Sequence, residues 1–339
     1  MNNKNLGIQG LRGGMMLWIV LFHFTTRYNQ LYPGNIDYEI MFDNGGTVGV
    51  IMFFIISGFF FGRFFWSFES IGSFKECSQK ISKNFLRRYY KLWKPYVISC
   101  IIITSFLVIL PLEGRTNTSI KVTLINLLFI WHPKVAYIDS AHWFMADLIY
   151  IQFMALLMLL FKKNYRKLIF ISYLCFLLSG YALLSMQDGD IVKKLNSVFL
   201  FRNSLAFSLG VLSNLLKEKS ALFEKILLII GLLSLTMFLS TLYVIICYIL
   251  FRVLTNRNSY LYKLMSNKVL VFMGEISFCW YLIHQNIGYS IMNILSCMGM
   301  HSEMQIFIPL VFTFSLAYAV YLLTNKINWI ENGKFTQNK

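Results

Sequence analysis

Charged residues are scarce in this sequence. They make up 14% of its 339 residues, while 57% are hydrophobic; soluble domains carry about 25% charged residues. Apolar runs of about 20 residues, the length of one membrane-spanning helix, recur along the chain. The composition excludes an ordinary soluble domain and predicts an all-α, polytopic protein embedded in a lipid bilayer.

Motifs of several other protein classes are missing as well. None of the six cysteines belongs to a CxxC pair, and the five histidines show no spacing typical of a metal site. Ser57 lies in SGF rather than in a G-x-S-x-G elbow, which argues against a serine hydrolase. The sequence also lacks a phosphate-binding loop and a dinucleotide fingerprint. We therefore expect neither a disulfide framework nor a metal.

Nothing in the sequence marks a second domain. It contains no repeat, no low-complexity segment and no long polar stretch. Lys4 and Arg12 precede an apolar run, as in a signal peptide, but the segment Thr25–Tyr28 is a poor cleavage site. We expect an uncleaved first span and one transmembrane domain over residues 1–339, with no appended soluble domain.

The apolar runs predict ten spans. The least certain two come from Ile226–Leu254, whose 29 residues fall between the roughly 20 that one helix needs and the roughly 40 that two need. We divide this run near residues 239–241, because a single span would reverse every later loop. The predicted spans lie near residues 10–30, 46–66, 95–112, 142–161, 167–186, 197–216, 224–240, 241–256, 269–295 and 304–325.

Basic residues outnumber acidic ones, 31 to 15, and give a net charge of +16. This excess is dispersed in short connectors between apolar runs, which argues against a nucleic-acid partner and for the positive-inside rule. With the N-terminus in the cytoplasm, 24 Lys and Arg fall on the cytoplasmic side and six on the opposite side. We therefore predict that both termini are cytoplasmic.

Arg12 and His23 form a pair along the first predicted span. Eleven residues separate them, which on a helix is about three turns, or ~16 Å, and returns to within roughly 20° of the same face. An arginine at one membrane surface and a histidine deep in the bilayer would then share one stripe. Ionisable groups inside a membrane are costly and tend to mark function. From the spacing alone, a histidine that only bonds a neighbouring helix is an equally open interpretation.

Four sequence blocks occur in order along the chain. The first runs from Gly10-Leu11-Arg12 to His23, and the second joins Gly49-Val50 to FFIISGF at residues 53–59. The third is FLRRYYKLWKPY at residues 85–96, and the fourth is MGEISFCWYLIHQ at residues 273–285. Together they resemble acyltransferase family 3, a family of integral membrane enzymes that acylate extracytoplasmic sugars.

The resemblance implies that His23 is the catalytic base. Acyl transfer from a thioester to a sugar hydroxyl needs a group that takes the hydroxyl proton, and imidazole, which titrates near neutral pH, suits that role. The resemblance also favours Arg12 as a binding residue for the coenzyme A phosphates, which a guanidinium can hold in a bidentate way. The alternative is that Arg12 is only a charge that sets topology.

Four further cations near the same membrane face are candidates for binding the donor phosphates. Contact with anionic lipid headgroups is an alternative that remains open for them. Family members often carry arginine where this chain has Lys91, which makes the role of that residue less secure. The candidates are Arg87, Arg88, Lys91 and Arg63.

His142, Trp143, Asp147 and His284 are candidates for binding the acceptor or supporting the site. His142 and Trp143 open the fourth predicted span at the outer face, where family members have an HxW-type block. Asp147 is an intramembrane acid with a structural or a functional role, and Arg202 is a possible partner within a span. His284 either contacts donor or acceptor or serves in packing.

Two positions depart from the family pattern. Many members carry a glutamate at the site that corresponds to Leu148, and Asp147 would point about 100° away from that site on a helix. The family frequently has lysine where this chain has Glu275, so a donor-binding role is not carried over to that residue.

The sequence thus predicts a bacterial inner-membrane O-acyltransferase that moves acetyl from cytoplasmic acetyl-CoA to a hydroxyl of an extracytoplasmic polysaccharide. O-antigen, capsule and exopolysaccharide are the expected acceptors, and acetyl-CoA is a co-substrate rather than a bound cofactor. Neither the sugar, the exact short acyl group nor the oligomeric state follows from the sequence.

Two other functions compete with this prediction. A flippase or transporter of lipid-linked oligosaccharides would also have about ten spans and cavity arginines, but it has no reason to place the Arg12–His23 stripe beside a basic inner segment. A polysaccharide polymerase usually needs a large outer loop, and the longest outer connector here has about 30 residues. We therefore keep the flippase as the alternative.

The charge distribution makes the topology testable. Reporter fusions are expected to place residues 68–94 and the C-terminus in the cytoplasm and residues 112–141 outside, because of the positive-inside bias. An outside C-terminus would contradict the division of residues 226–254 into two spans.

Overall fold

The structure, a computed structural model, describes residues 5–36, 45–68, 73–112, 119–128, 137–186, 189–215, 222–236, 249, 253 and 256–337. These residues form helices and no strand, which confirms the all-α prediction for this part of the chain. The main elements are α1 (Leu6–Phe22), η1 (His23–Arg27), α2 (Tyr28–Leu31), α3 (Gly45–Ser67), α4 (Phe74–Ile109), α5 (Ile120–Leu127), η2 (Ser140–His142), α6 (Trp143–Leu157), η3 (Met158–Leu160), α7 (Lys163–Met186), α8 (Asp190–Phe199), α9 (Phe201–Leu215), α10 (Leu222–Thr236), α12 (Tyr260–Met265), α13 (Lys268–Cys297) and α14 (Ser302–Gln337).

The first predicted span is a helix that changes its winding at His23. Asn5 caps α1 by accepting a hydrogen bond from the backbone N–H of Ile8 at 3.2 Å. The α-helix then passes into the π-helix η1 at His23 and continues as α2. π-Helical segments are rare and often occur at functional sites. The wider turn therefore begins at the residue for which the sequence predicts a catalytic role.

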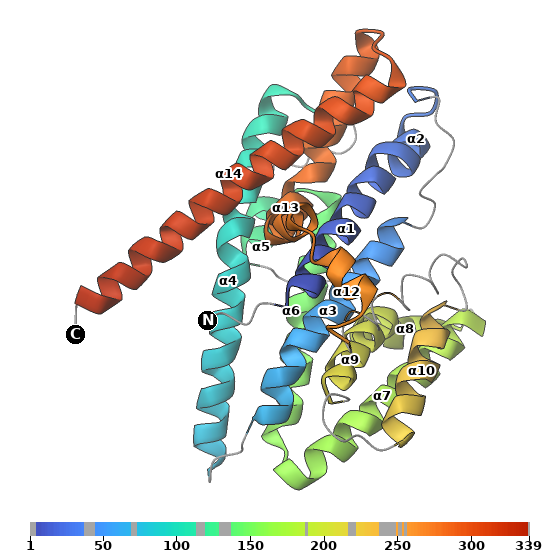
Figure 1. The fold of residues 1–339 in the computed structure, drawn as a ribbon, viewed down its shortest axis with the longest axis vertical. Helices are drawn as coiled ribbons and strands as arrows, with labels where there is room; N and C mark the ends of the chain where they lie inside the picture. Colours follow the sequence, from blue (N-terminus) through green and yellow to red (C-terminus); the bar gives the residue numbers. More distant parts are fainter. Residues whose placement is uncertain are drawn as a thin grey trace.

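Glycines allow α1 and α13 to touch through their backbones (Figure 1). A Cβ atom on Gly274 would clash with the backbone oxygen of Gln9, and one on Gly13 would clash with the backbone oxygen of Leu270. Small residues permit such close approach between membrane helices, where dispersion forces rather than water exclusion drive association. The glycine of the fourth sequence block thus has a packing role.

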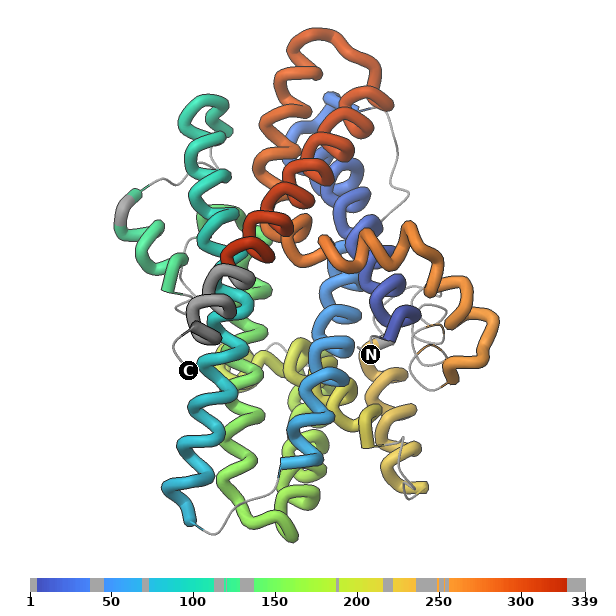
Figure 2. The backbone as a smooth tube through the Cα atoms, turned by 60° about the vertical axis from the view of Figure 1, so that its left-hand side comes forward, coloured from blue at the N-terminus to red at the C-terminus, as the bar shows by residue number. Residues whose placement is uncertain are grey.

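The helices α3 and α9 meet in the same way. A Cβ atom on Gly58 would clash with the backbone oxygen of Phe207, and one on Gly210 would clash with that of Ile55. The remaining helices surround these two pairs: α14 packs along α13, and α7 and α10 pack on α9. Figure 2 shows the long α4 running down one side of the molecule.

Arg166, a predicted inner-loop charge, is a buried anchor between helix ends. Its Nη1 donates to the carbonyl oxygen of Phe68 at 2.6 Å, and its Nη2 donates to those of Leu159 and Phe161 at 3.3 and 3.1 Å. Carbonyls at helix C-termini lack partners within the helix and attract cations. One guanidinium thus joins the end of α3 to the link between η3 and α7.

The helix boundaries correct the sequence prediction at two places. The segment 68–94, predicted as a connector, is largely the first half of α4, which begins at Phe74 and contains Pro95 in its interior. Hydropathy detected only the apolar half of this amphipathic helix. The predicted span 197–216 is broken at Leu200, whose φ of 47° separates α8 from α9. The axes of these two helices differ by 45°.

Among the described residues, five helical segments are long and apolar enough to cross a membrane, and α8 with α9 would make a sixth if the bent pair is one span. The five are α3, α4, residues 140–160, α7 and α14. The ten-span count stays a prediction, and the predicted turn near residues 239–241 lies outside the described residues.

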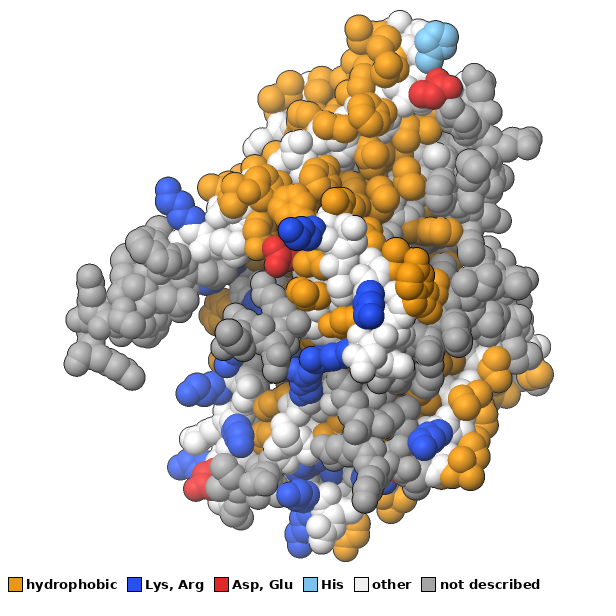
Figure 3. All heavy atoms as spheres, in the orientation of Figure 1, with side chains coloured by type: hydrophobic (Ala, Val, Ile, Leu, Met, Phe, Trp, Pro, Cys, Tyr) orange, Lys and Arg blue, Asp and Glu red, His pale blue; other side chains and the backbone are white. Residues whose placement is uncertain are grey.

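Basic side chains are unevenly distributed over the surface. On the face in Figure 3, Lys and Arg gather over the lower half, toward the end where α3 stops and α4 starts, and apolar side chains dominate the upper half. If both termini are cytoplasmic, the positive-inside rule requires basic side chains to concentrate at one end of the molecule. The orientation of the termini stays a prediction.

The α1–α13 contact predicts the effect of one methyl group. Gly274→Ala is expected to lower the free energy of unfolding by about 1–3 kcal/mol, because the backbone of Gln9 cannot give way as a flexible side chain could. Gly14→Ala is the matched control: a Cβ there meets nothing within 4 Å, so we expect no loss and a gain of up to about 1 kcal/mol from helix propensity. Thermal unfolding in detergent measures both, and equal effects would contradict the close contact.

Candidate functional site

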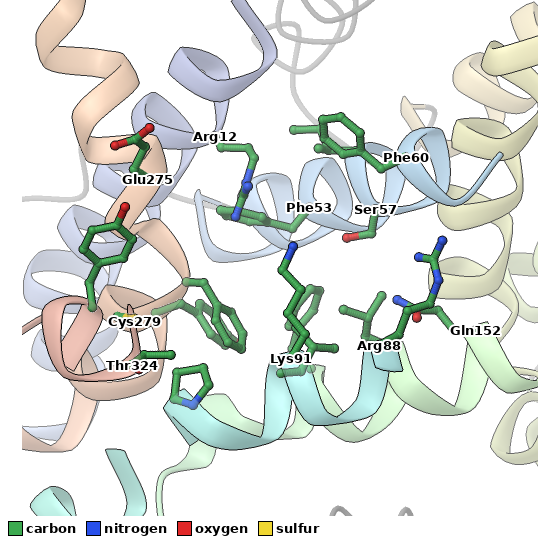
Figure 4. A pocket seen from close by; sticks show the side chains of 18 of the residues that line it. Arg12, Phe53, Ser57, Phe60, Arg88, Lys91, Gln152, Glu275, Cys279 and Thr324 are labelled. Carbon is green, nitrogen blue, oxygen red and sulfur yellow. The ribbon is translucent and has the colours of Figure 1, made fainter. Parts of the chain in front are cut away.

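An inner cavity of about 380 Å³ gathers three predicted cations (Figure 4). Arg12 comes from α1, whereas Arg88 and Lys91 come from the basic half of α4. In Figure 4, the side chains of Arg12 and Lys91 point toward each other across the cavity. The walls between them are mostly aromatic and aliphatic, with Glu275 and Gln152 as polar members. Such a space can hold a ligand that joins phosphates to an apolar arm.

Neighbouring helices fix the directions of two of these cations. Arg12 donates from Nη2 to Ser277 Oγ on α13 at 3.2 Å and from Nη1 to Gln9 Oε1 at 3.4 Å. The Arg88 guanidinium lies 4.8 Å from the ring centroid of Phe61 and 5.6 Å from that of Phe64. Both guanidinium groups are therefore oriented before a ligand arrives, which lowers the entropic cost of binding.

The other two predicted donor residues lie elsewhere. Arg87 is exposed on α4, and the residues that line the inner cavity do not include it. Arg63 lines a separate cavity of about 190 Å³ together with Trp66 and Asn214. The structure brings Arg12, Arg88 and Lys91 together and leaves Arg87 and Arg63 apart from them.

A second cavity, of about 250 Å³, is lined by His23; we call it the outer cavity, because the predicted topology would place it toward the outer face. Beyond His23, its polar lining includes Arg27 from the same π-helix and Arg202 from the first turn of α9. Trp143, a predicted acceptor residue, and Gln285, the last residue of the fourth block, also line this cavity. The spacing that predicted a functional stripe thus places its two ends in two different cavities.

Val50 and Tyr281 line both cavities. The two spaces are therefore neighbours, and these two side chains form part of the boundary between them. The hydroxyl of Tyr281 donates to the carbonyl oxygen of Ala141 in η2, which holds the ring in place. Sequence analysis did not single out either residue, although both belong to the four blocks.

His284 packs directly against His23. Their ring centroids are 4.9 Å apart, in an edge-to-face arrangement. Nδ1 of His284 lies 2.8 Å from the carbonyl oxygen of Tyr281. Because a carbonyl only accepts, Nδ1 carries the hydrogen of the neutral ring and Nε2 is left as an acceptor. Among the described residues, no hydrogen-bond partner faces that Nε2 atom.

His142 is a packing residue of the outer helix junction. It is buried, its Nε2 lies 2.8 Å from the carbonyl oxygen of Leu282, and its ring contacts that of Tyr96 at 4.9 Å between centroids. Asp139 accepts from the backbone N–H of Asn286 at 2.9 Å. Leu282 and Asn286 lie about one turn apart on α13. Asp139 and His142, in the segment that leads into α6, therefore bond to the backbone of α13 within one turn.

Asp147 is buried between α6 and α9. Its Oδ2 accepts from Asn203 Nδ2 at 2.8 Å. The sequence analysis offered Arg202 as a possible partner of Asp147. In the structure the hydrogen-bond donor is the side-chain amide of Asn203, one position later. This bond joins α6 to α9, and the first turns of both helices border the outer cavity. Asp147 therefore helps to hold the helices that form the cavity wall.

The polar groups of the outer cavity were only partly predictable. The sequence gives Arg27 only as a charge at the outer end of the first span and Arg202 only as a residue within a span, because nothing in it shows that α9 packs on α3. A usable signal existed for Arg27, which follows His23 by four residues and therefore shares its side of the helix.

Among the described residues, no group of three or more His, Cys, Asp or Glu is arranged to hold a metal ion.

Comparison with known proteins identifies the family. Residues 5–324, nearly the whole chain, match the acyltransferase domain of acyltransferase family 3. No curated protein and no solved structure matches the chain. The matched range includes all four sequence blocks and both ends of the Arg12–His23 stripe. The chain therefore belongs to acyltransferase family 3, whose members are membrane acyltransferases.

Proposed function

We propose that this protein transfers an acetyl group from cytoplasmic acetyl-CoA to a hydroxyl of an extracytoplasmic polysaccharide, with His23 as general base. O-antigen, capsule and exopolysaccharide are the acceptor classes, and the bacterial inner membrane is the location. The observation that carries the proposal is the pair of neighbouring cavities on α1, one with Arg12 and one with His23, which share Val50 and Tyr281 as lining.

The inner cavity supports binding of the donor. Coenzyme A carries phosphates at one end and an apolar thioester arm at the other, and the cavity combines three cations with aromatic walls. Guanidinium groups recognise phosphate through paired N–H donors, and a lysine contributes a point charge. The arm would extend along α1 toward His23, which is ~16 Å from Arg12 along a helix.

The outer cavity supports the chemical step. The hydroxyl oxygen of the sugar attacks the carbonyl carbon of the thioester while His23 takes the hydroxyl proton. The carbon–sulfur bond then breaks, and the protonated imidazole returns the proton to the departing thiolate. His284, whose tautomer is fixed by the Tyr281 carbonyl, lies edge-on to His23 and orients its ring. It is a positioning residue in this scheme.

The flippase alternative accounts for less of the site. A flippase needs a continuous path for a lipid-linked oligosaccharide, and it accounts for cavity arginines through the phosphates of that lipid, but it gives no role to His23 in the neighbouring cavity. Membership of an acyltransferase family also favours group transfer. Binding of acetyl-CoA to the purified protein discriminates between the two functions.

Arg12 provides a test of donor binding. Arg12→Lys is expected to weaken acetyl-CoA binding by about tenfold. A lysine ammonium cannot replace the paired N–H donors of a planar guanidinium, which the hydrogen bond to Ser277 orients. Arg257→Lys is the control, since Arg257 is exposed in an inner connector. Isothermal titration on both variants measures the effect. Unchanged affinity in Arg12→Ala, with an unchanged unfolding temperature, would reduce Arg12 to a topology charge.

His23 provides a test of the chemical step. His23→Ala is expected to lower the rate of acetyl transfer to the native glycan by on the order of 10²–10⁴, the usual contribution of a general base, and to leave acetyl-CoA binding largely intact. His301→Ala, at an exposed histidine outside the outer cavity, is the matched control. Near-normal transfer by His23→Ala in proteoliposomes would rule out this mechanism.

A further inference from the structure

Two arginines share the outer cavity with His23. Arg27 follows His23 by four residues on η1, and Arg202 lies in the first turn of α9. None of the described residues that line this cavity is Asp or Glu. Charged side chains within a membrane protein are costly unless a counter-charge is near. Two guanidinium groups facing one cavity without a lining carboxylate therefore indicate a ligand that brings the negative charge.

Two of the carboxylates that the structure describes on neighbouring elements already accept hydrogen bonds. Asp139 accepts from the backbone N–H groups of Ala141 and Asn286, both at 2.9 Å. Asp147 accepts from Asn203 at 2.8 Å. These oxygens hold helices together, so they do not serve as free counter-ions for a guanidinium.

The arginines themselves keep donors available. Arg27 donates from Nη1 to Gln30 Oε1 at 3.0 Å, which uses one of the five N–H donors of a guanidinium. Arg202 forms no hydrogen bond or ion pair with another residue that the structure describes. Both side chains are half-buried and line the cavity.

Helix ends add to the positive potential. Residues in the first turns of α3 and α9, Gly46 and Arg202, line this cavity. Helix N-termini carry partial positive charge, which favours anions. Both helix starts therefore add to the charge of the two arginines.

Gln285 contributes the complementary polar group. It lines the cavity, is 2% exposed, and its Oε1 has no hydrogen-bond partner among the described residues. An amide oxygen accepts hydrogen bonds, so it suits a hydroxyl donor. The cavity therefore offers cations for an anionic group and an acceptor for a hydroxyl, beside the ring of His23.

We propose that the acceptor is an anionic glycan, whose carboxylate or phosphate is bound by Arg27 and Arg202 while Gln285 accepts a hydrogen bond from a sugar hydroxyl. This inference rests on the proposed function and specifies its substrate class. Arg27 is about one helical turn from His23, and side chains so spaced lie about 5–6 Å apart at Cβ. The anionic group thus belongs to the acylated sugar or to the unit next to it.

The test is binding to the purified full-length protein with the inner cavity saturated by coenzyme A. The probes are glucuronate, inorganic pyrophosphate and glucose, measured by isothermal titration. At least one anion is expected to bind tenfold or more tightly than glucose. Preference for glucuronate assigns the charge to an acidic sugar, and preference for pyrophosphate assigns it to a phosphate or a diphosphate-linked carrier.

Variants connect this binding to the two arginines. Arg27→Gln and Arg202→Gln are each expected to weaken the preferred anion by about 10- to 100-fold, the range for hydrogen bonds to charged groups. Lys194→Gln, an exposed cation of α8 outside the cavity, is the matched control and is expected to stay within twofold. Coenzyme A affinity and unfolding temperature, unchanged in each variant, establish that the fold is intact, and Arg27→Lys is expected to restore part of the affinity.

The outcomes separate this inference from the proposed function. Equal binding of the anions and glucose, or anion binding that is the same in Arg27→Gln, Arg202→Gln and Lys194→Gln, would overturn the anionic acceptor even if acetyl transfer occurs. Anion binding that depends on both arginines supports it. A wild-type protein that binds the anion but never transfers acetyl would contradict the proposed function alone.

Discussion

The backbone contact between α1 and α13 determines where both cavities lie. Gly13 and Gly274 let the two helices approach until a single Cβ atom would clash. One helix carries Arg12 and His23, and the other carries Ser277 and His284, which contact them. Because both partners of each contact are on rigid helices in close packing, the separation between the inner arginine and the outer histidine is set by the helix itself.

Side chains form part of the boundary between the two cavities. Val50 and Tyr281 line both spaces. Tyr281 is held by η2, and η2 is held in turn by the bonds of Asp139 and His142 to the backbone of α13. In the proposed mechanism, an acyl group at the end of the donor's arm passes between the two cavities at these side chains, so the sugar does not have to cross the membrane.

Part of this arrangement follows from the sequence. The apolar runs located α3 and α13 to within one or two residues, and the 11-residue spacing placed Arg12 and His23 along one helix. Hydropathy missed the first half of α4, because a basic amphipathic segment looks like a connector when its helical partner surfaces are unknown. The break at Leu200 was missed too, since an αL conformation at a leucine is imposed by the surrounding packing rather than by local preference.

The residues of the candidate site also divide into those that the sequence predicted and those that it did not. Arg87 and Arg88 are neighbours in sequence, but their side chains differ by about 100° in direction around a helix. Of the two, only Arg88 lines the inner cavity. Arg202 joined the outer cavity through the packing of α9 on α3, a contact that no local pattern encodes. Residues on one helix were thus predictable from periodicity, and residues brought together by tertiary packing were not.

In the proposed mechanism, donor and acceptor reach His23 from opposite sides of the membrane. The most direct measurement uses proteoliposomes in which labelled acetyl-CoA is supplied to the side of the cytoplasmic termini and the native glycan to the other side. Labelled glycan is expected only in this arrangement, and His23→Ala is expected to abolish the label. Efficient labelling with donor and glycan confined to one side would contradict transfer between two cavities.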